Sequence, residues 1–263
     1  MPVAQVNGQR IHYQDTGGAG PPVIFSHGLI MDHEMFAPQV AALDGRYRVI
    51  TWDERGHGGT AGASLEPFSC YDSADDLVAL LGHLGIDRAV LAGMSQGGFL
   101  SLRAALTHPD VVRALILIDT EAGVEDPARM AGYKQLVDGW VTGGLSDDTA
   151  DFIEATILGE GWDGAPAWKA KWKSVAPHNV LGCMDCLAGR DDITGKLHGI
   201  RAPALVIHGD ADAAITLDHA HILARELPNA ELVVVKGAGH AANLTHPGVV
   251  NPAIEAFLER VTA

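Results

Sequence analysis

Cysteine and basic residues are scarce in this chain, and both shortages exclude classes of protein. The 263 residues include three cysteines, an odd number that does not make a disulfide framework, so we expect a reducing compartment. Lys and Arg number 18 against 33 Asp and Glu, which gives a formal net charge of -15 at pH 7. Because this charge repels phosphate backbones and anionic lipid heads, neither nucleic acid nor membrane is expected as a partner.

Long hydrophobic runs are also missing. No apolar run approaches the length that spans a bilayer, and the opening residues MPVAQVNGQRIHYQ lack the basic start and apolar segment of a signal peptide. We therefore expect a cytoplasmic protein. With 47% hydrophobic residues, a chain of this length can bury one large core.

Two of the cysteines, Cys183 and Cys186, form a C-x-x-C pattern. A redox pair of this kind is expected near a strand end, and a zinc site needs a second ligand pair nearby. The surrounding sequence HNVLGCMDCLAG offers neither feature. We expect two thiols that pack on a helix, and no metal site.

Short apolar runs alternate with helical patterns after an N-terminal hairpin, which an Asn-Gly turn in VNGQ indicates. The runs lack polar alternation, as is typical of parallel strands covered on both faces. They occupy residues 22–26, 47–52, 89–92, 114–119, 204–208 and 231–235. Together with the hairpin they predict an α/β fold with an eight-stranded, mostly parallel sheet and helices on both faces.

One interval is far longer than a crossover helix requires. About 80 residues separate the fourth of these runs from the fifth. The interval contains Trp140, Trp162, Trp168 and Trp172. We expect residues 121–199 to form a helical cap, inserted after the sixth strand into a core made of residues 1–120 and 200–263.

Residues 93–97 read Gly-Met-Ser-Gln-Gly and match the G-x-S-x-G pattern, in which a strand turns sharply into a helix and exposes the central serine. A serine hydroxyl attacks an ester at neutral pH only if a base takes its proton and a carboxylate orients that base. The loops after the last two predicted strands supply both, since Asp210 and Asp212 lie in GDADAAI and His240 lies in KGAGHAANLTHP. Ser95 is thus followed by an acid and then by a histidine.

Five segments in this order resemble those of the α/β-hydrolases, and the resemblance covers nearly the whole chain. SHGL (26–29) resembles the oxyanion loop, WDERGHGGT (52–60) the D-x-R-G-x-G segment, and GMSQGG the nucleophile elbow. HGDAD resembles the acid loop and GAGHAANLTHP the histidine loop. The resemblance implies that Ser95 is the nucleophile, His240 the base, and Asp212 rather than Asp210 the acid.

The resemblance also assigns supporting roles. The backbone N–H groups of Leu29 and Gln96 are expected to form the oxyanion hole. Arg55 is expected to hold its loop through an ion pair with an acid such as Asp53, rather than to bind a substrate carboxylate, and Asp119 to act as a structural turn residue. The candidate substrate-binding residues are His27, Met94, Trp140, Trp162 and Met184, although His27 is expected mainly to tie down the oxyanion loop.

The expected function is that of a serine hydrolase that cleaves a carboxylic ester of a small molecule through an acyl-enzyme, with no cofactor. Serine at the elbow disfavours epoxide hydrolases and haloalkane dehalogenases, which place aspartate there. The resemblance to small bacterial carboxylesterases and 3-oxoadipate enol-lactonases keeps a lactonase open. A C-C bond hydrolase, a cofactor-free perhydrolase and a non-catalytic ligand receptor remain alternatives, as does a homo-oligomer.

Overall fold

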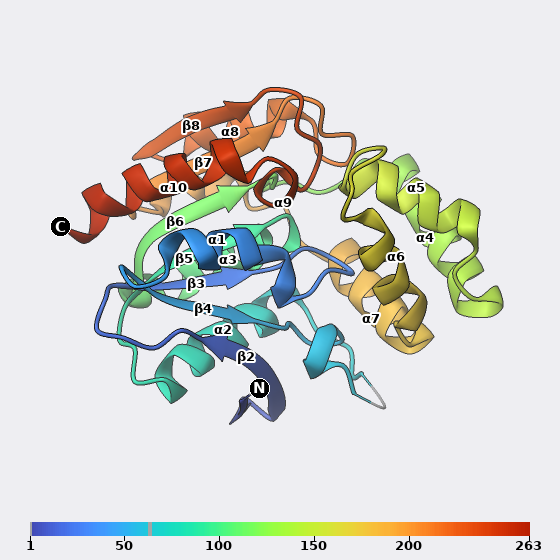
Figure 1. Cartoon of the computed structure of the whole chain (residues 1–263), viewed down its shortest axis with the longest axis horizontal. Coiled ribbons are helices and arrows are strands. Elements are labelled where there is room, and N and C mark those ends of the chain that lie inside the picture. Colours follow the sequence, from blue (N-terminus) through green and yellow to red (C-terminus); the bar gives the residue numbers. More distant parts are fainter. Residues whose placement is uncertain (1, 63–64) are drawn as a thin grey trace.

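One eight-stranded sheet runs through the computed structural model, which describes residues 2–62 and 65–263 (Figure 1). Its strands are β1 (Val3–Val6), β2 (Gln9–Asp15), β3 (Pro22–Ser26), β4 (Arg48–Trp52), β5 (Ala89–Met94), β6 (Val112–Ile118), β7 (Ala204–Gly209) and β8 (Ala230–Val235). Their order across the sheet is β1-β2-β4-β3-β5-β6-β7-β8. β3 to β8 are parallel, and β2 pairs antiparallel with both β1 and β4. The mostly parallel sheet predicted from the apolar runs is confirmed.

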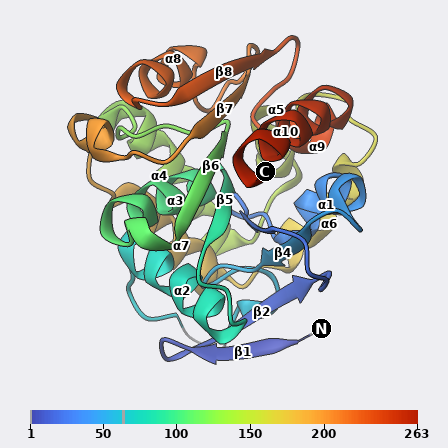
Figure 2. The ribbon, with the colours of Figure 1, turned by 90° about the vertical axis from the view of Figure 1, so that its left-hand side faces the viewer.

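Helices cover both faces of this sheet, with α2, α3 and α8 on one face and α1 and α10 on the other (Figure 2). The ten α-helices of the described residues are α1 (Ala37–Leu43), α2 (Cys70–His83), α3 (Gln96–Thr107), α4 (Pro127–Gly143), α5 (Asp147–Ile157), α6 (Ala165–Ser174), α7 (Pro177–Ala188), α8 (Leu217–Glu226), α9 (Ala242–Thr245) and α10 (Pro247–Thr262). The central strands are apolar throughout because both of their faces are covered; every residue of β5 and of β7 is buried. No helix within the described ranges is both long and apolar enough to cross a membrane.

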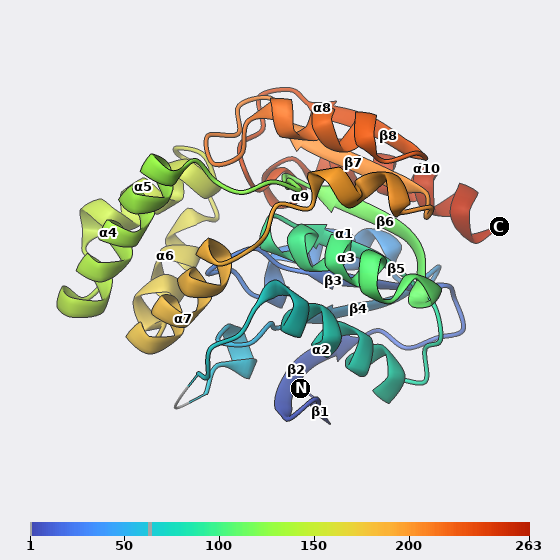
Figure 3. The ribbon, with the colours of Figure 1, turned by 180° about the vertical axis from the view of Figure 1, so that it is seen from behind.

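The helices α4 to α7, called here the cap helices, lie between β6 and β7 in the chain and gather beyond one end of the sheet (Figures 1 and 3). The two ends of this segment meet. The N–H of Ile193 donates to the carbonyl of Ala122 at 3.0 Å, and Arg190 pairs with Glu121. The chain therefore leaves the core and returns to it at one point.

Candidate active site

Ser95 occupies a strained turn between β5 and α3. Its φ of 51° and ψ of -116° lie outside the regions that L-residues ordinarily adopt. The backbone is packed so closely here that a Cβ on Gly93 would collide with the backbone of Gly97, and one on Gly97 would collide with that of Ser26. The two glycines of the G-x-S-x-G pattern therefore allow the turn that presents the Ser95 hydroxyl.

The structure brings Ser95, His240 and Asp212 together in one line of hydrogen bonds. His240 Nε2 lies 2.9 Å from Ser95 Oγ, and His240 Nδ1 lies 2.8 Å from Asp212 Oδ2. The other oxygen of Asp212 accepts the N–H groups of Ala214 at 2.8 Å and Ile215 at 2.9 Å, which fixes the carboxylate. A base next to the hydroxyl and a carboxylate behind the base is the arrangement that activates a serine.

The charges of Asp212 and His240 stabilise each other. Burial would lower the pKa of His240, but the charge and hydrogen bond of Asp212 outweigh burial and raise that pKa above its ordinary value. Burial correspondingly opposes ionisation of Asp212, yet its histidine partner holds the pKa of this carboxyl below the usual range. Asp212 is therefore ionised and ready to stabilise the imidazolium that forms when Ser95 loses its proton.

Asp119 connects the loops that carry these two residues. Its Oδ1 accepts the N–H of Gly209 at 2.8 Å, and its Oδ2 accepts the N–H of Ala242 at 2.9 Å. It is fully buried, has a positive φ of 46°, and its pKa is raised by burial and by the nearby charge of Asp212. The expected turn residue is thus a bridge between the acid loop and the histidine loop.

Asp210, the other candidate acid, lies outside this arrangement. Its Oδ1 accepts the N–H of Gly237 at 2.6 Å, so it links the turns that follow β7 and β8. Its exposed carboxylate has the turn-capping role expected for it.

Backbone donors lie on both sides of Ser95. Gln96 is the first residue of α3, so its N–H has no acceptor within the helix and is free to face a ligand. On the other side, a Cβ on Gly28 would lie only 3.4 Å from the Cβ of Ser95, which shows how closely the loop after β3 approaches the elbow. Leu29 follows in this loop and lines the same cavity as Ser95. The two predicted oxyanion segments therefore flank the serine.

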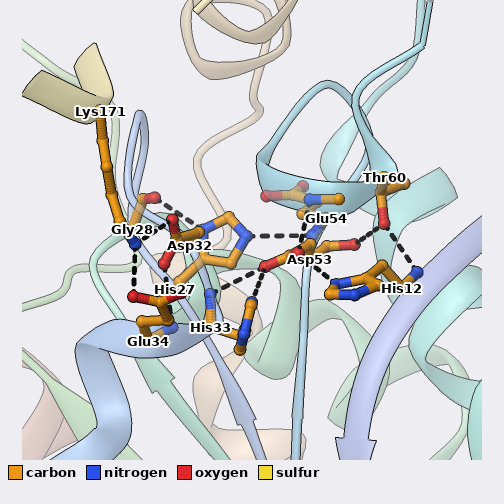
Figure 4. A network of polar contacts seen from close by, with 11 residues as sticks. His12, His27, Gly28, Asp32, His33, Glu34, Asp53, Glu54, Thr60 and Lys171 are labelled. Carbon is orange, nitrogen blue, oxygen red and sulfur yellow. Dashed lines mark hydrogen bonds and ion pairs between the residues drawn. The ribbon is translucent and has the colours of Figure 1, made fainter. Parts of the chain in front are cut away.

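Two histidines hold the loop after β3 (Figure 4 shows the first). His27 Nδ1 donates to the carbonyl of Gly28 at 2.8 Å, and its Nε2 accepts the N–H of Glu54 at 3.0 Å. His57 Nε2 accepts the N–H of Ile30 at 3.1 Å. Burial and the proximity of His27 lower the pKa of His57 to about 3, which preserves the neutral ring that can accept this bond.

Asp53 anchors the far end of the same loop (Figure 4). Its carboxylate accepts the backbone N–H groups of His33 and Gly59, both at 2.8 Å, and the Nδ1 groups of His33 at 2.7 Å and His12 at 2.8 Å. Burial opposes ionisation, but the hydrogen bond from His33 and the neighbouring imidazoles lower the pKa of Asp53. His12, His33 and Asp53 are close enough to be considered as metal ligands, yet four donors already satisfy the carboxylate. In this structure the cluster fixes the loop.

Arg55 forms an ion pair with an acid, as expected, but this acid is Asp76 and not Asp53. Its Nε and Nη2 donate to the two oxygens of Asp76 on α2, at 2.5 and 2.8 Å. The pair is bidentate and Asp76 is fully buried, which makes it a rigid link between the loop after β4 and α2. The expectation that Arg55 holds its loop is correct, but the partner lies 21 residues away in the chain.

A cavity of about 150 Å³ opens beside Ser95 and His240. Apolar side chains of the cap helices form much of its wall, among them Met130, Val137, Trp140, Ile153, Val180 and Met184. Of the predicted substrate-binding residues, Met94, Trp140 and Met184 line this cavity. His27 and Trp162 do not: His27 is occupied with the loop hydrogen bonds, and Trp162 packs over Gly164 at the start of α6.

The guanidinium that reaches this cavity is already paired. Arg190 donates to Glu121 Oε1 at 2.6 Å, to the carbonyl of Gly123 at 3.2 Å and to that of Leu187 at 3.0 Å, and it stacks 4.5 Å from the centre of the Phe99 ring. Burial opposes the ionisation of Glu121, but His219 and Arg190 lower its pKa. The positive charge of Arg190 is therefore neutralised at the cavity wall.

Three buried charged residues near the site were missed in the sequence. Glu54 accepts a hydrogen bond from the Gln96 side chain and so ties the loop after β4 to the elbow. Two of these residues have positions that could have indicated a role. Glu54 lies inside the segment WDERGHGGT, and Glu121 follows Asp119 by two residues. Arg190 lies near the end of the cap segment, where no motif marks it.

An eight-stranded α/β sheet that presents Ser95, Asp212 and His240 on loops at its strand ends defines a hydrolase of the α/β class. Residues 21–247 match the family model described as alpha/beta hydrolase fold, and the chain belongs to this family.

Relatives of known name cover nearly all of the chain. It is 27% identical to 3-oxoadipate enol-lactonase 2 of Acinetobacter baylyi, over 95% of this chain and 93% of the relative. A thermophilic esterase from Thermogutta terrifontis superposes with a TM-score of 0.90 at 26% identity, covering 100% of this chain and 99% of the other. The enol-lactonase from Burkholderia xenovorans LB400 superposes with a TM-score of 0.89 at 27% identity, covering 98% and 100%. The likeness is thus to both esterases and lactonases.

Proposed function

We propose that this hydrolase is a serine esterase acting on an uncharged ester with a small apolar acyl or alcohol group. The observation that carries the proposal is the line Asp212–His240–Ser95, whose serine faces an apolar cavity under the cap helices. The likeness to an esterase of 26% identity over the full chain supports it.

The proposed reaction proceeds through an acyl-enzyme in two steps. His240 Nε2 takes the Ser95 proton as Oγ attacks the ester carbonyl, and the N–H groups of Leu29 and Gln96 stabilise the oxyanion. The alcohol leaves with the proton from His240. Water, deprotonated by the same nitrogen, then cleaves the acyl-enzyme and restores Ser95.

The cavity supports a neutral substrate. An apolar space of roughly 150 Å³ accommodates a molecule the size of benzene, so an acyl group of about four to six carbons fits. Because the charge of Arg190 is already neutralised by Glu121, a substrate carboxylate would be buried here without a free partner among the described residues. The likeness to enol-lactonases supports a lactone as a second candidate, since ring opening uses the same acyl-enzyme, and the apolar cavity favours a neutral one.

The test is hydrolysis of p-nitrophenyl esters from acetate to decanoate by the wild type and by Ser95→Ala. We expect a burst of p-nitrophenol in the wild type that is absent in Ser95→Ala, and the highest kcat/KM near butyrate to hexanoate. An unchanged burst in Ser95→Ala would refute the nucleophile.

A matched pair of substrates tests the charge preference separately. p-Nitrophenyl butyrate and p-nitrophenyl hemisuccinate are similar in size, but only the second carries a carboxylate. We expect kcat/KM to fall by at least about tenfold for the hemisuccinate, since 1.4 kcal/mol of unpaired-charge cost already has this effect. Equal values would show that the neutral-substrate assignment is wrong while leaving the nucleophile intact.

A further inference from the structure

Cys70 and Cys186 face each other where the core meets the cap helices. Cys70 is the first residue of α2 and Cys186 lies in the last turn of α7, and their sulfur atoms are 3.8 Å apart although 116 residues separate them in the chain. Both thiols are free in this structure and almost fully enclosed, with exposed fractions of 1% and 2%. The two helix ends lie side by side (Figure 3).

We propose that Cys70 and Cys186 form a reversible disulfide, made by reaction with a peroxide, that fastens the cap helix α7 to the core helix α2. The C-x-x-C pattern places Cys186 next to Cys183 in the sequence. The structure instead gives Cys186 a partner from a distant part of the chain.

The surroundings divide the two thiols into an attacking and a resolving one. The hydrogen bond from Cys186 and the guanidinium of Arg103 lower the pKa of Cys70, and its place at the N-terminus of α2 favours a thiolate further. The same hydrogen bond, together with burial, raises the pKa of Cys186, which stays a thiol. A cysteine that reacts reversibly with peroxide combines a low-pKa thiolate, a second thiol beside it and access for the peroxide. Cys70 has the first two features, and because it is buried, peroxide reaches it only when the contact between α2 and α7 opens.

The chemistry balances in two steps. The Cys70 thiolate attacks one oxygen of hydrogen peroxide, which breaks the O–O bond, releases hydroxide and leaves a sulfenic acid on Cys70. The Cys186 sulfur then attacks the sulfenic sulfur and releases water, its own proton included. Two thiols have lost two electrons to one peroxide, and a dithiol reductant returns them.

Little movement is required. A disulfide has an S–S distance of about 2.05 Å, so the sulfurs must approach each other by roughly 1.8 Å. Cys183, one turn earlier on α7, provides a matched control because it is equally buried but points elsewhere. Its sulfur donates to the carbonyl of Arg55 at 3.5 Å and lies 3.6 Å from His57 Nδ1.

The cross-link would act on the cavity wall. α7 contributes Val180, Met184 and Leu187 to the lining beside Ser95. Fixing the end of α7 to α2 restricts the outward movement that admits a large ester. We therefore expect the oxidised protein to be more stable and to discriminate more strongly against long acyl chains.

The first experiment maps the bond. The wild type and the variants Cys70→Ala, Cys186→Ala and Cys183→Ala are treated with hydrogen peroxide, the remaining thiols are alkylated, and unreduced digests are analysed by mass spectrometry. We expect one intramolecular Cys70–Cys186 link in the wild type and in Cys183→Ala, and none in the other two variants. The proposal would be overturned by any of four results: three alkylated thiols, a link through Cys183, a link between two chains, or sulfinic acid alone.

The second experiment tests whether the disulfide holds α7 against α2. We expect the melting temperature of the oxidised wild type to rise by about 5 °C or more, as a long closed loop predicts, and to return after dithiothreitol. The ratio of decanoate to butyrate hydrolysis should fall at least twofold on oxidation in the wild type and in Cys183→Ala. If the link forms while neither quantity changes, its role in fastening α7 is refuted.

Discussion

The loops around Ser95 and the cap helices above it are held by different forces. In the loops, buried carboxylates accept backbone N–H groups: Asp212 those of Ala214 and Ile215, and Asp119 those of Gly209 and Ala242. The cap helices rely on apolar packing and on ion pairs near the surface. We therefore expect changes in the loops to affect mainly the reaction and changes in the cap helices to affect mainly the ester preference.

The largest effect on kcat is expected from Asp212→Asn, a change in the loops around Ser95. The amide cannot stabilise the imidazolium and favours the wrong histidine tautomer, so kcat should fall by about 10⁴-fold. The measurement is kcat for p-nitrophenyl butyrate, with Asp210→Asn as the control. Comparable losses in the two variants would contradict the assignment of Asp212 as the acid.

A smaller loss is expected from Asp119→Asn, which tests positioning without touching the reacting atoms. One backbone N–H would face the new amide group instead of an oxygen, so the acid loop or the histidine loop shifts, and kcat should fall by about 10²-fold. Burial and the charge of Asp212 raise the pKa of Asp119 to about 8, so Asp119 is largely uncharged at neutral pH, and the pH midpoint of kcat/KM should stay near that of the wild type. The exposed Asp110→Asn is the control, and a midpoint that moves to lower pH would show that Asp119 acts on His240 through its charge.

The pH dependence of the wild-type activity tests whether Asp212 raises the pKa of His240. His240 must be neutral to take the serine proton, and its pKa lies above the ordinary 6.5. Activity should therefore rise with pH, about tenfold per unit below the pKa, with a midpoint above 6.5. A midpoint at or below that value would show that Asp212 does not raise the pKa of His240.

The smallest effect is expected from Lys171→Met, a change in the cap helices that should lower the free energy of unfolding only slightly. Lys171 on α6 donates to Asp32 at 2.7 Å and Glu34 at 2.8 Å in the loop after β3, and lies over the Trp168 ring (Figure 4 shows the two acids). Since the Lys171 side chain is about one-third exposed, loss of this contact should cost only ~0.2–1 kcal/mol of unfolding free energy, measured in urea.

The ester preference of Lys171→Met should change more than its pH midpoint, because Lys171 joins α6 to the loop after β3 and takes no part in the hydrogen bonds among Ser95, His240 and Asp212. Lys173→Met, which loses a pair within the cap, is the matched control. A shifted pH midpoint in Lys171→Met would show that the two regions are not independent.

Local features of the sequence predicted the sheet and the segments that meet at Ser95. The apolar runs indicated the strands because a run without polar residues is typical of a strand buried on both faces. The G-x-S-x-G pattern indicated the elbow because the turn requires glycine within two residues of the serine. Contacts between distant segments left no such local signal. The partner of Arg55 is on α2, Cys186 meets Cys70 across 116 residues, and Trp162, which packs over Gly164, does not line the cavity.

The meeting of Ala122 with Ile193, reinforced by Glu121 and Arg190, has a consequence for how such chains diversify. Because the inserted segment starts and finishes at one closed junction, its length can change without altering the spacing of β6 and β7. We therefore expect the cap helices to be exchangeable as a unit. A chimaera joined at this junction should keep its hydrolytic machinery and acquire the ester preference of the donor.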